Sequence, residues 1–157
     1  MFKLHRKVEF ALIALKHMSR KRPGELTSAK EVSETFGCSF DTTARVMQQL
    51  ASHHILHSSQ GASGGYLILK DLAKISLYDL SLILLGPVKL VKCLSSTQCT
   101  LESHCNIVTP MHILNQHLID LYKNLNLHEL LAGANSPSVI KHKSHINKSN
   151  HTSETHQ

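Results

Sequence analysis

The sequence predicts a mainly α-helical fold with a small β-wing: a winged helix-turn-helix domain followed by a long helix. Two short helical patterns flank a turn at Gly37, a glycine-rich hairpin pattern follows at 55–69, and regularly spaced leucines mark a last helix from Thr109. We divide the 157 residues into a winged helix-turn-helix at 1–85, a cysteine-rich loop at 86–108, the last helix at 109–134 and a tail at 135–157.

The first predicted helix runs from about Arg6 to Ser19. Its apolar residues recur at helical spacing and form one stripe: Val8, Ala11, Leu12, Leu15 and Met18. Cations followed by Pro23 and Gly24 end it. Glu9 lies off the apolar stripe, so we expect its carboxylate to remain accessible.

The helix-turn-helix is predicted around Gly37. Ser28, or the residue before it, caps the first helix of the pair, and Glu31 stands where a capping box needs an acid. The second helix starts near Ser39 and continues to about residue 51. Cys38 lies at the turn, where we expect a buried small residue rather than a metal ligand.

The positions of glycine and serine residues predict the wing and the helix after it. Three glycines within residues 61–65 supply the positive-φ conformations that a hairpin tip needs, which predicts strand, turn and strand over 55–69. Ser76 then caps a short helix at 77–85, and Gly86 stops it.

The last helix is predicted to open at Thr109, with Pro110 in its first turn. Its leucines, spaced by four, three and four residues, form a seam: Leu114, Leu118, Leu121 and Leu125. Ordinary core packing would also explain this seam. We predict a homodimer instead, because a small winged domain leaves little core to cover such a helix. The tail from Asn135 is polar and is expected to be disordered.

Charge is unevenly distributed along the chain. The formal net charge is +6, and residues 1–80 hold eleven Lys and Arg against seven Asp and Glu, whereas residues 81–135 hold three of each. A basic first half suits a module that binds a polyanion such as DNA. No apolar run approaches the roughly 20 residues that a membrane span needs. No signal-peptide core is evident, so we expect a cytoplasmic protein without a membrane partner.

The outer face of the second helix of the pair carries side chains suited to reading double-stranded DNA. Arg pairs with guanine and Gln with adenine in the major groove. The candidate residues on this helix are Ser39, Asp41, Thr42, Arg45, Gln48 and Gln49. Phosphate contacts are expected from Lys3, Lys7, Ser59 and Gln60. An ordinary polar helix face, or an adaptor that no longer binds DNA, is the alternative interpretation.

Three cysteines carry the strongest chemical signal. Cys93, Cys99 and Cys105 are separated by five residues each, in a polar segment without periodicity. Thiolates select iron–sulfur clusters, zinc or copper(I), and the absence of closely paired cysteines argues against zinc. We predict an iron–sulfur cluster, either two-iron or four-iron. A structural zinc, a thiol redox switch and buried thiols remain alternatives.

A fourth ligand must come from outside the three cysteines. His104 adjoins Cys105, but a solvated loop residue is the simpler interpretation. Glu9 is the more interesting candidate, because a hard carboxylate among soft thiolates makes one exchangeable bond that suits a sensor. The chain shows neither a phosphate-cradling glycine motif nor paired acid and base residues. No cysteine stands at a helix N-terminus, so we do not expect an enzyme.

The helix-turn-helix, the Gln60–Tyr66 wing and the three cysteines, in this order, resemble the Rrf2 family of bacterial regulators over residues 1–131. The resemblance includes cluster-bearing IscR, NsrR and RirA types. It implies that Cys93, Cys99 and Cys105 bind a cluster. IscR-type members place a His where Val108 stands here, whereas NsrR-type members use an acidic residue of the other subunit's first helix, where Glu9 stands.

The resemblance therefore implies an NsrR-like or redox-responsive regulator, expected to be a repressor that responds to nitric oxide, redox state or iron supply. Its dimer would bind a palindromic operator with half-sites about 34 Å apart. Two departures affect operator choice. Ala44 replaces a frequent acidic residue, and Gln60 replaces a frequent basic residue of the wing. The operator sequence cannot be borrowed from a known member.

Overall fold

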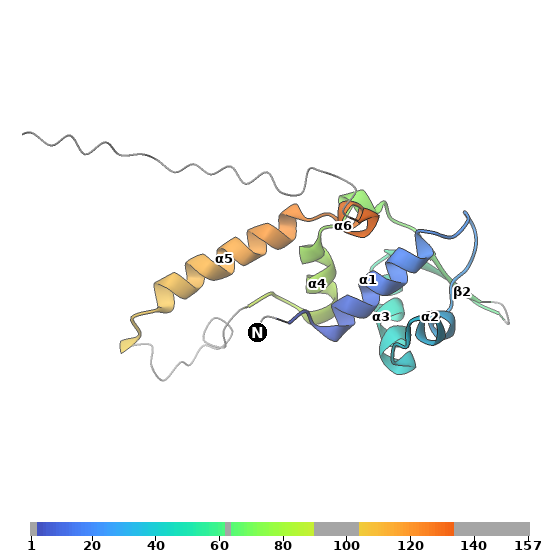
Figure 1. The fold of residues 1–157 in the computed structure, drawn as a ribbon, viewed down its shortest axis with the longest axis horizontal. Helices are drawn as coiled ribbons and strands as arrows, with labels where there is room; N and C mark the ends of the chain where they lie inside the picture. The colour runs from blue at the N-terminus through green and yellow to red at the C-terminus, as the bar shows by residue number, and fades with distance from the viewer. Residues whose placement is uncertain (1–2, 62–63, 90–103, 134–157) are drawn as a thin grey trace, which may run out of the picture.

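The computed structural model describes residues 3–61, 64–89 and 104–133 (Figure 1). In chain order the elements are α1 (Arg6–Met18), α2 (Ala29–Phe36), α3 (Phe40–Ser52), β1 (Leu56–Ser59), β2 (Gly65–Ile68), the 3₁₀ helix η1 (Leu72–Lys74), α4 (Leu77–Leu85), α5 (Val108–Asn124) and α6 (Leu127–Ala132). The predicted fold class, a mainly helical winged helix-turn-helix with a small β-wing and a long helix after it, is confirmed.

The core lies where α1, α2, α3 and α4 meet. Leu15 of α1, Val46 and Leu50 of α3 and Leu80 of α4 are fully buried, and they belong to one continuous apolar cluster. Burial of large aliphatic side chains is the main stabilising contribution in such a small domain. Figure 1 shows α4 between α1 and α5, so α5 packs on the domain through α4.

The helix-turn-helix forms where the sequence predicts it, with one difference at its first cap. Ser28 Oγ accepts a hydrogen bond from the Glu31 N–H at 3.1 Å, as expected. The Glu31 carboxylate does not return to the Ser28 backbone; it binds His17 and Lys21 instead. The capping box is therefore half-formed. Gly37 ends α2 with a left-handed φ of 66°.

The wing is an antiparallel pair in which Leu56 faces Ile68 and Ser59 faces Gly65. Thr27, ahead of α2, bridges to Tyr66 and extends this sheet by one short segment. Two glycines are required by close approach. A Cβ on Gly64 would lie 2.6 Å from the Ser59 carbonyl oxygen, and one on Gly65 would lie 2.9 Å from the Thr27 carbonyl oxygen.

The C-terminal part differs from the prediction of one helix over 109–134. Helix α5 begins one residue earlier, at Val108, without a side-chain cap, and ends at Asn124. The chain then crosses to the segment before α4, where the Leu77 N–H donates to the Leu125 carbonyl and the Leu127 N–H donates to the Ile75 carbonyl, both at 2.8 Å. Asn126 caps the separate helix α6 through its side chain.

Helix α6 is held against the first helix of the domain. Lys16 of α1 donates a hydrogen bond from its ammonium group to the Leu131 carbonyl, and Leu127 is fully buried. Among the described residues, no helix combines the length and apolarity needed to cross a membrane.

Candidate nucleic-acid interface and cysteine ligands

Helix α3 presents one polar row to solvent. Its buried side, formed by Thr43, Val46, Met47 and Leu50, faces the core. On the opposite side, Asp41, Arg45, Gln48 and Ser52 are exposed at spacings of four, three and four residues. Thr42 and Gln49, also predicted as DNA-binding residues, are half-buried at the margins of this row. Sequence reasoning missed Ser52, although the same periodicity points to it.

The start of α3 leaves backbone donors accessible. Ser39 is the N-cap residue, yet its hydroxyl caps no backbone N–H of the helix. Instead, the Thr42 hydroxyl donates to Ser39 Oγ at 3.4 Å and the Thr43 hydroxyl donates to the Ser39 carbonyl at 2.9 Å. Free N–H groups at a helix N-terminus can bind the oxygens of a phosphate.

Lys7 extends the polar row of α3 with a positive charge. The Lys7 side chain lines an open depression together with Arg45, Gln48, Gln49 and Ser52, although Lys7 belongs to α1. Among the described residues, neither Lys7 nor Arg45 forms an ion pair, so both charges can attract an anion. Lys3 lies elsewhere, in a hollow that Lys89 and Tyr122 also line.

The wing supplies exposed polar groups beside α3. Ser59, the last residue of β1, and Gln60 after it are both exposed. Gly61 adopts a φ of 123°, which turns the chain toward the tip. Residues 62–63 lie outside the described part of the chain. The wing can therefore offer Ser59 and Gln60 to the sugar–phosphate backbone of DNA.

The predicted cluster ligands are only partly within the described chain. Cys93 and Cys99 fall in the segment 90–103, outside the described residues. Cys105 is half-buried and forms no disulfide with Cys38, the other cysteine within the described residues, so its sulfur can bind a metal. It lies just before α5, at the end of that helix farther from α6 (Figure 1). Glu9 is exposed on α1.

The described residues alone do not build a metal site. No group of three or more His, Cys, Asp or Glu residues within them is close enough to hold a metal ion. The donor chemistry nevertheless fits an iron–sulfur cluster, because three cysteine thiols in a short segment are the ligand type that such clusters take. Cys105, which lies within the described residues, has a free thiol.

Cys38 is half-buried, which corrects the expectation that this residue is fully buried. Burial raises the pKa of the Cys38 thiol, and the negative charge of Glu9 raises that pKa further. A thiol with a raised pKa is a poor metal ligand, because metals bind the thiolate. The charge of Glu9 therefore acts on the thiol at the helix-turn-helix turn.

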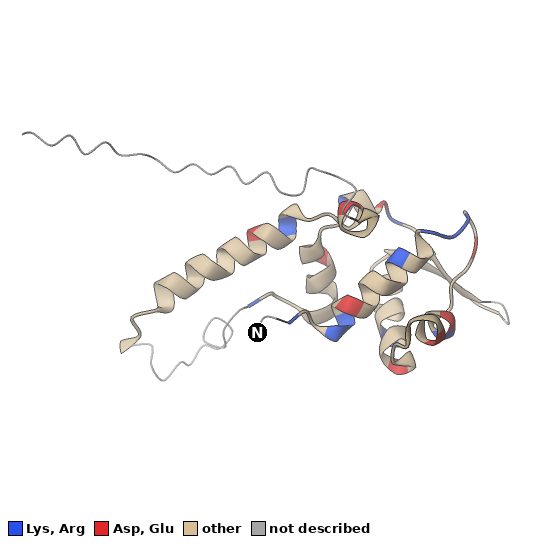
Figure 2. Cartoon of the chain, viewed as in Figure 1, with Lys and Arg blue, Asp and Glu red and all other residues tan. Residues whose placement is uncertain are grey.

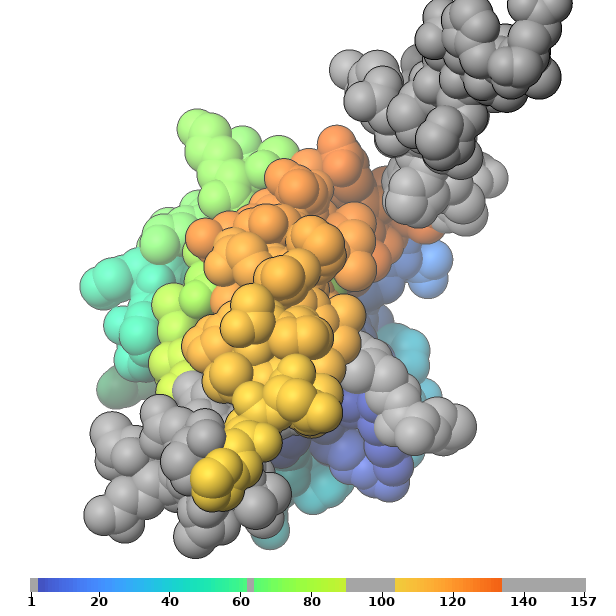
Figure 3. Space-filling model, turned by 90° about the vertical axis from the view of Figure 1, so that its left-hand side faces the viewer, coloured from blue at the N-terminus to red at the C-terminus, as the bar shows by residue number. Residues whose placement is uncertain are grey.

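The leucine seam of α5 divides between two environments. Leu118 and Leu125 are half-buried and pack on the core beside the buried Tyr122, whereas Leu114 and Leu121 are 50% and 54% exposed. Ile113 is exposed as well. Figure 3 shows α5 uncovered along this face of the molecule, and Figure 2 shows its few charges gathered near its C-terminal end. An uncharged apolar surface of this kind is typical of a protein–protein interface.

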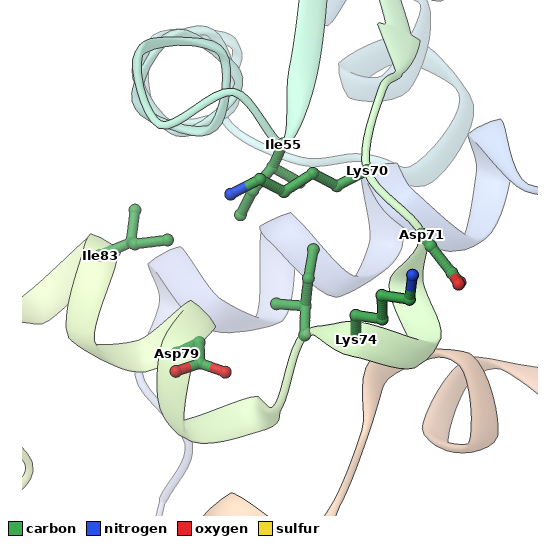
Figure 4. A pocket seen from close by; sticks show the side chains of 7 residues that line it. Ile55, Lys70, Asp71, Lys74, Asp79 and Ile83 are labelled. Atoms are coloured by element: carbon green, nitrogen blue, oxygen red, sulfur yellow. The ribbon is translucent and has the colours of Figure 1, made fainter.

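A hollow of about 550 Å³ at the base of the wing was not predicted. Its floor contains Ile55 and Ile83, and Figure 4 shows the Lys70 side chain reaching across it. Its two carboxylates are already engaged in helix capping: Asp71 accepts from the Ala73 N–H and Asp79 from the Ser76 N–H and hydroxyl. Because both carboxylates cap helices, we assign this hollow a structural role and no ligand.

Comparison with known proteins identifies regulators of one kind. The profile of the Rrf2 family, described as an iron-dependent transcriptional regulator, matches residues 4–133. The HTH-type transcriptional regulator NsrR of Bacillus subtilis strain 168 is 24% identical over 119 residues, which cover 74% of this chain and 80% of that protein.

Solved structures share the fold at lower identity. The oxidized form of CymR from Staphylococcus aureus superposes with a TM-score of 0.66 at 20% identity, covering 86% of this chain and all of that one. IscR of T. potens superposes with a TM-score of 0.62 at 17% identity, covering 90% of this chain and 94% of that one.

Proposed function

The chain belongs to the Rrf2 family of DNA-binding transcriptional regulators, and we propose that it is a homodimeric repressor whose operator affinity depends on an iron–sulfur cluster. The observation that carries the DNA-binding part is the exposed row of α3, which includes Arg45 and has Lys7 beside it; neither cation forms an ion pair with another described residue. The family members are regulators rather than enzymes. The protein works in the cytoplasm, where a bacterial regulator meets its DNA.

In this proposal α3 enters the major groove. Arg45 donates two hydrogen bonds to a guanine, and Gln48 and Gln49 are the candidates for adenine. Lys7 and the free N–H groups at the start of α3 bind phosphates, which fixes the helix in register without reading sequence. Lys3, Ser59 and Gln60 are further phosphate contacts. The wing contributes little base reading, because Gln60 carries no charge to place in the minor groove.

The exposed side of α5 supports pairing of two protomers. Ile113, Leu114 and Leu121 together present apolar surface that no described part of the same chain covers. Pairing of two such helices around a two-fold axis buries this surface and aligns two recognition helices with a palindromic operator.

Cys93, Cys99 and Cys105 are the residues that would hold the cluster, and Glu9 of a second subunit is the candidate for the fourth ligand. When bound, the cluster supplies iron and sulfide that react with oxidants or nitric oxide and respond to iron supply. Glu9 belongs to α1, which packs against α3, so a bond to this carboxylate would tie the cysteine segment to the DNA-reading domain. A coupling of roughly 1–3 kcal/mol would change operator affinity by about 5- to 150-fold.

The second candidate is a thiol redox switch or a structural zinc at the same three cysteines. The CymR structure, which this fold resembles, was solved in an oxidized form, and Cys105 carries a free, half-buried thiol. In this alternative, oxidation of the cysteines replaces loss of a cluster as the event that alters DNA binding.

The iron and sulfide content of the full chain, purified without oxygen, separates the two candidates. We expect brown protein that contains both iron and acid-labile sulfide, and a variant with all three cysteines changed to alanine that contains neither. Colourless protein with zinc, or with no metal, would reject the cluster in favour of the alternative.

DNA binding has its own test, in which bound fragments are selected from genomic DNA and their affinity is followed over a range of salt concentrations. We expect a selected sequence to bind at least 10³-fold more tightly than unrelated DNA, with affinity falling steeply as salt rises. Equal affinity for all sequences would show that the protein binds DNA without sequence specificity and is not an operator-specific regulator.

A further inference from the structure

An apolar ridge runs along one flank of the recognition helix, beside its polar row. Phe40 is the first residue of α3 and Ala44 follows one turn later; Gln48 continues the same line after a second turn. Phe40 is 53% exposed, whereas Ala44 is half-buried and packs against the core with only part of its surface open to solvent. The ridge therefore joins a large apolar side chain directly to a residue of the proposed base-reading row.

The described part of the chain leaves the Phe40 ring open to solvent. Phe36, on the other side of the turn, is also exposed, but its ring packs edge-on against His17 at 5.3 Å. No described aromatic ring or cation covers Phe40 in this way. A single exposed ring is not unusual on a protein surface, but this ring stands at the start of the recognition helix, where side chains reach the base edges of DNA.

We infer that Phe40, with Ala44, reads the C5-methyl group of thymine in the major groove. The first residues of a recognition helix are those that reach base edges. Thymine is the one base that presents a methyl group there, and Phe and Ala are side chains that contact it. Gln48 on the same line suits the neighbouring adenine, so the ridge favours A·T base pairs. This inference rests on the proposed DNA-binding function and adds a base preference to it.

Replacement of thymine by deoxyuridine in DNA tests the inference, because it removes only the methyl group. A duplex is first selected from a random library by the full chain, and each thymine is then replaced singly. We expect at least one replacement to weaken binding by about fourfold, which corresponds to the free energy of burying one methyl group. In the Phe40→Ala variant, the same replacement should change affinity less than 1.5-fold.

The comparison forms a double-mutant cycle between one side chain and one methyl group. Phe36→Ala is the matched control, since it removes an equally large exposed ring across the turn and should keep the fourfold effect. Phe40→Leu retains an apolar contact, keeps part of the effect and guards against a folding defect in Phe40→Ala. Circular dichroism checks that each variant is folded.

The outcomes are distinct. If the deoxyuridine effect is the same in the parent and in Phe40→Ala, Phe40 does not read a methyl group and the inference is overturned. If Phe40→Ala changes the oligomeric state or the binding of another protein but not the thymine dependence, the ring serves a protein contact and the inference is again wrong. If no duplex is selected at all, the proposed function itself fails.

Discussion

The ammonium nitrogen of Lys21 lies 2.6 Å from Glu31 Oε1, and the same oxygen lies 2.7 Å from Nε2 of His17. This carboxylate therefore joins the end of α1 to the first helix of the helix-turn-helix. Burial alone would raise the pKa of the Glu31 carboxyl, but the hydrogen bonds from His17 and Lys21 outweigh burial and lower it. The ion pairs thus help to orient α2, on which α3 packs.

Glu31→Gln should lower the free energy of unfolding by roughly 1 kcal/mol at pH 7, because it removes a partly exposed ion pair with Lys21 and weakens the hydrogen bond with His17. A lowered pKa means that the stabilisation is present above the unfolded value of 4.5 and is lost as pH falls through the folded value. Urea unfolding should therefore show the parent and the variant converging in acid. Glu34→Gln, which removes a mostly exposed ion pair with Lys30, is the control and should have little effect.

Arg45→Ala and Lys7→Gln should weaken DNA binding in different ways. Loss of Arg45 should cost about 1–3 kcal/mol on the selected operator and relax base preference at one position. Loss of Lys7 should weaken specific and unrelated DNA alike and reduce the salt slope by about one. Titrations at several salt concentrations measure both. A loss of nonspecific affinity alone in Arg45→Ala would show that Arg45 contacts phosphate and not a base.

Glu9→Ala should shorten the lifetime of the cluster in air or nitric oxide, followed by visible absorption, because the cluster loses its fourth ligand. Two controls isolate the carboxylate. Glu34→Ala removes an exposed acid from α2, and Cys38→Ala removes the thiol near Glu9; both should leave the lifetime unchanged. If Glu9→Ala has the spectrum and lifetime of the parent, Glu9 is not a ligand.

Leu114→Glu with Leu121→Glu should convert the protein to monomers, because charges would be buried between two copies of α5. Analytical ultracentrifugation measures the change in mass. His112→Glu adds a charge on the opposite side of α5 and should leave the dimer intact. A double variant that stays dimeric would place the interface elsewhere on the molecule.

The winged helix-turn-helix could be predicted because its signals are local. Apolar spacing marks α1, Gly37 ends α2, and the glycines near residue 64 leave no space for a side chain in the wing. The break after α5 was missed because Leu125 continues the leucine spacing. Asn126, three residues before Glu129, was the local signal, since its side chain caps α6.

Long-range contacts explain the remaining differences. The Glu31 carboxylate was assigned to its own helix cap, whereas it pairs with His17 and Lys21, residues that no local pattern brings near it. The depression that unites Lys7 with α3 likewise depends on how α1 packs. Each of these features is set by packing between helices and not by a neighbour in sequence.

Two backbone hydrogen bonds, donated by Leu77 and Leu127, join the start of α4 to the chain after α5. They fix the C-terminal end of α5, so that this helix can act as a lever. The helix is held against the domain from Leu118 to its C-terminal end, and the residues before Leu118 project about 15 Å toward the end next to Cys105. A rotation of about 5° at the anchored part displaces the far tip by about 1 Å over that length. Small rotations of the winged domain therefore produce larger displacements at the cysteine end of α5. Conversely, a displacement of that end is transmitted to the winged domain as a rotation.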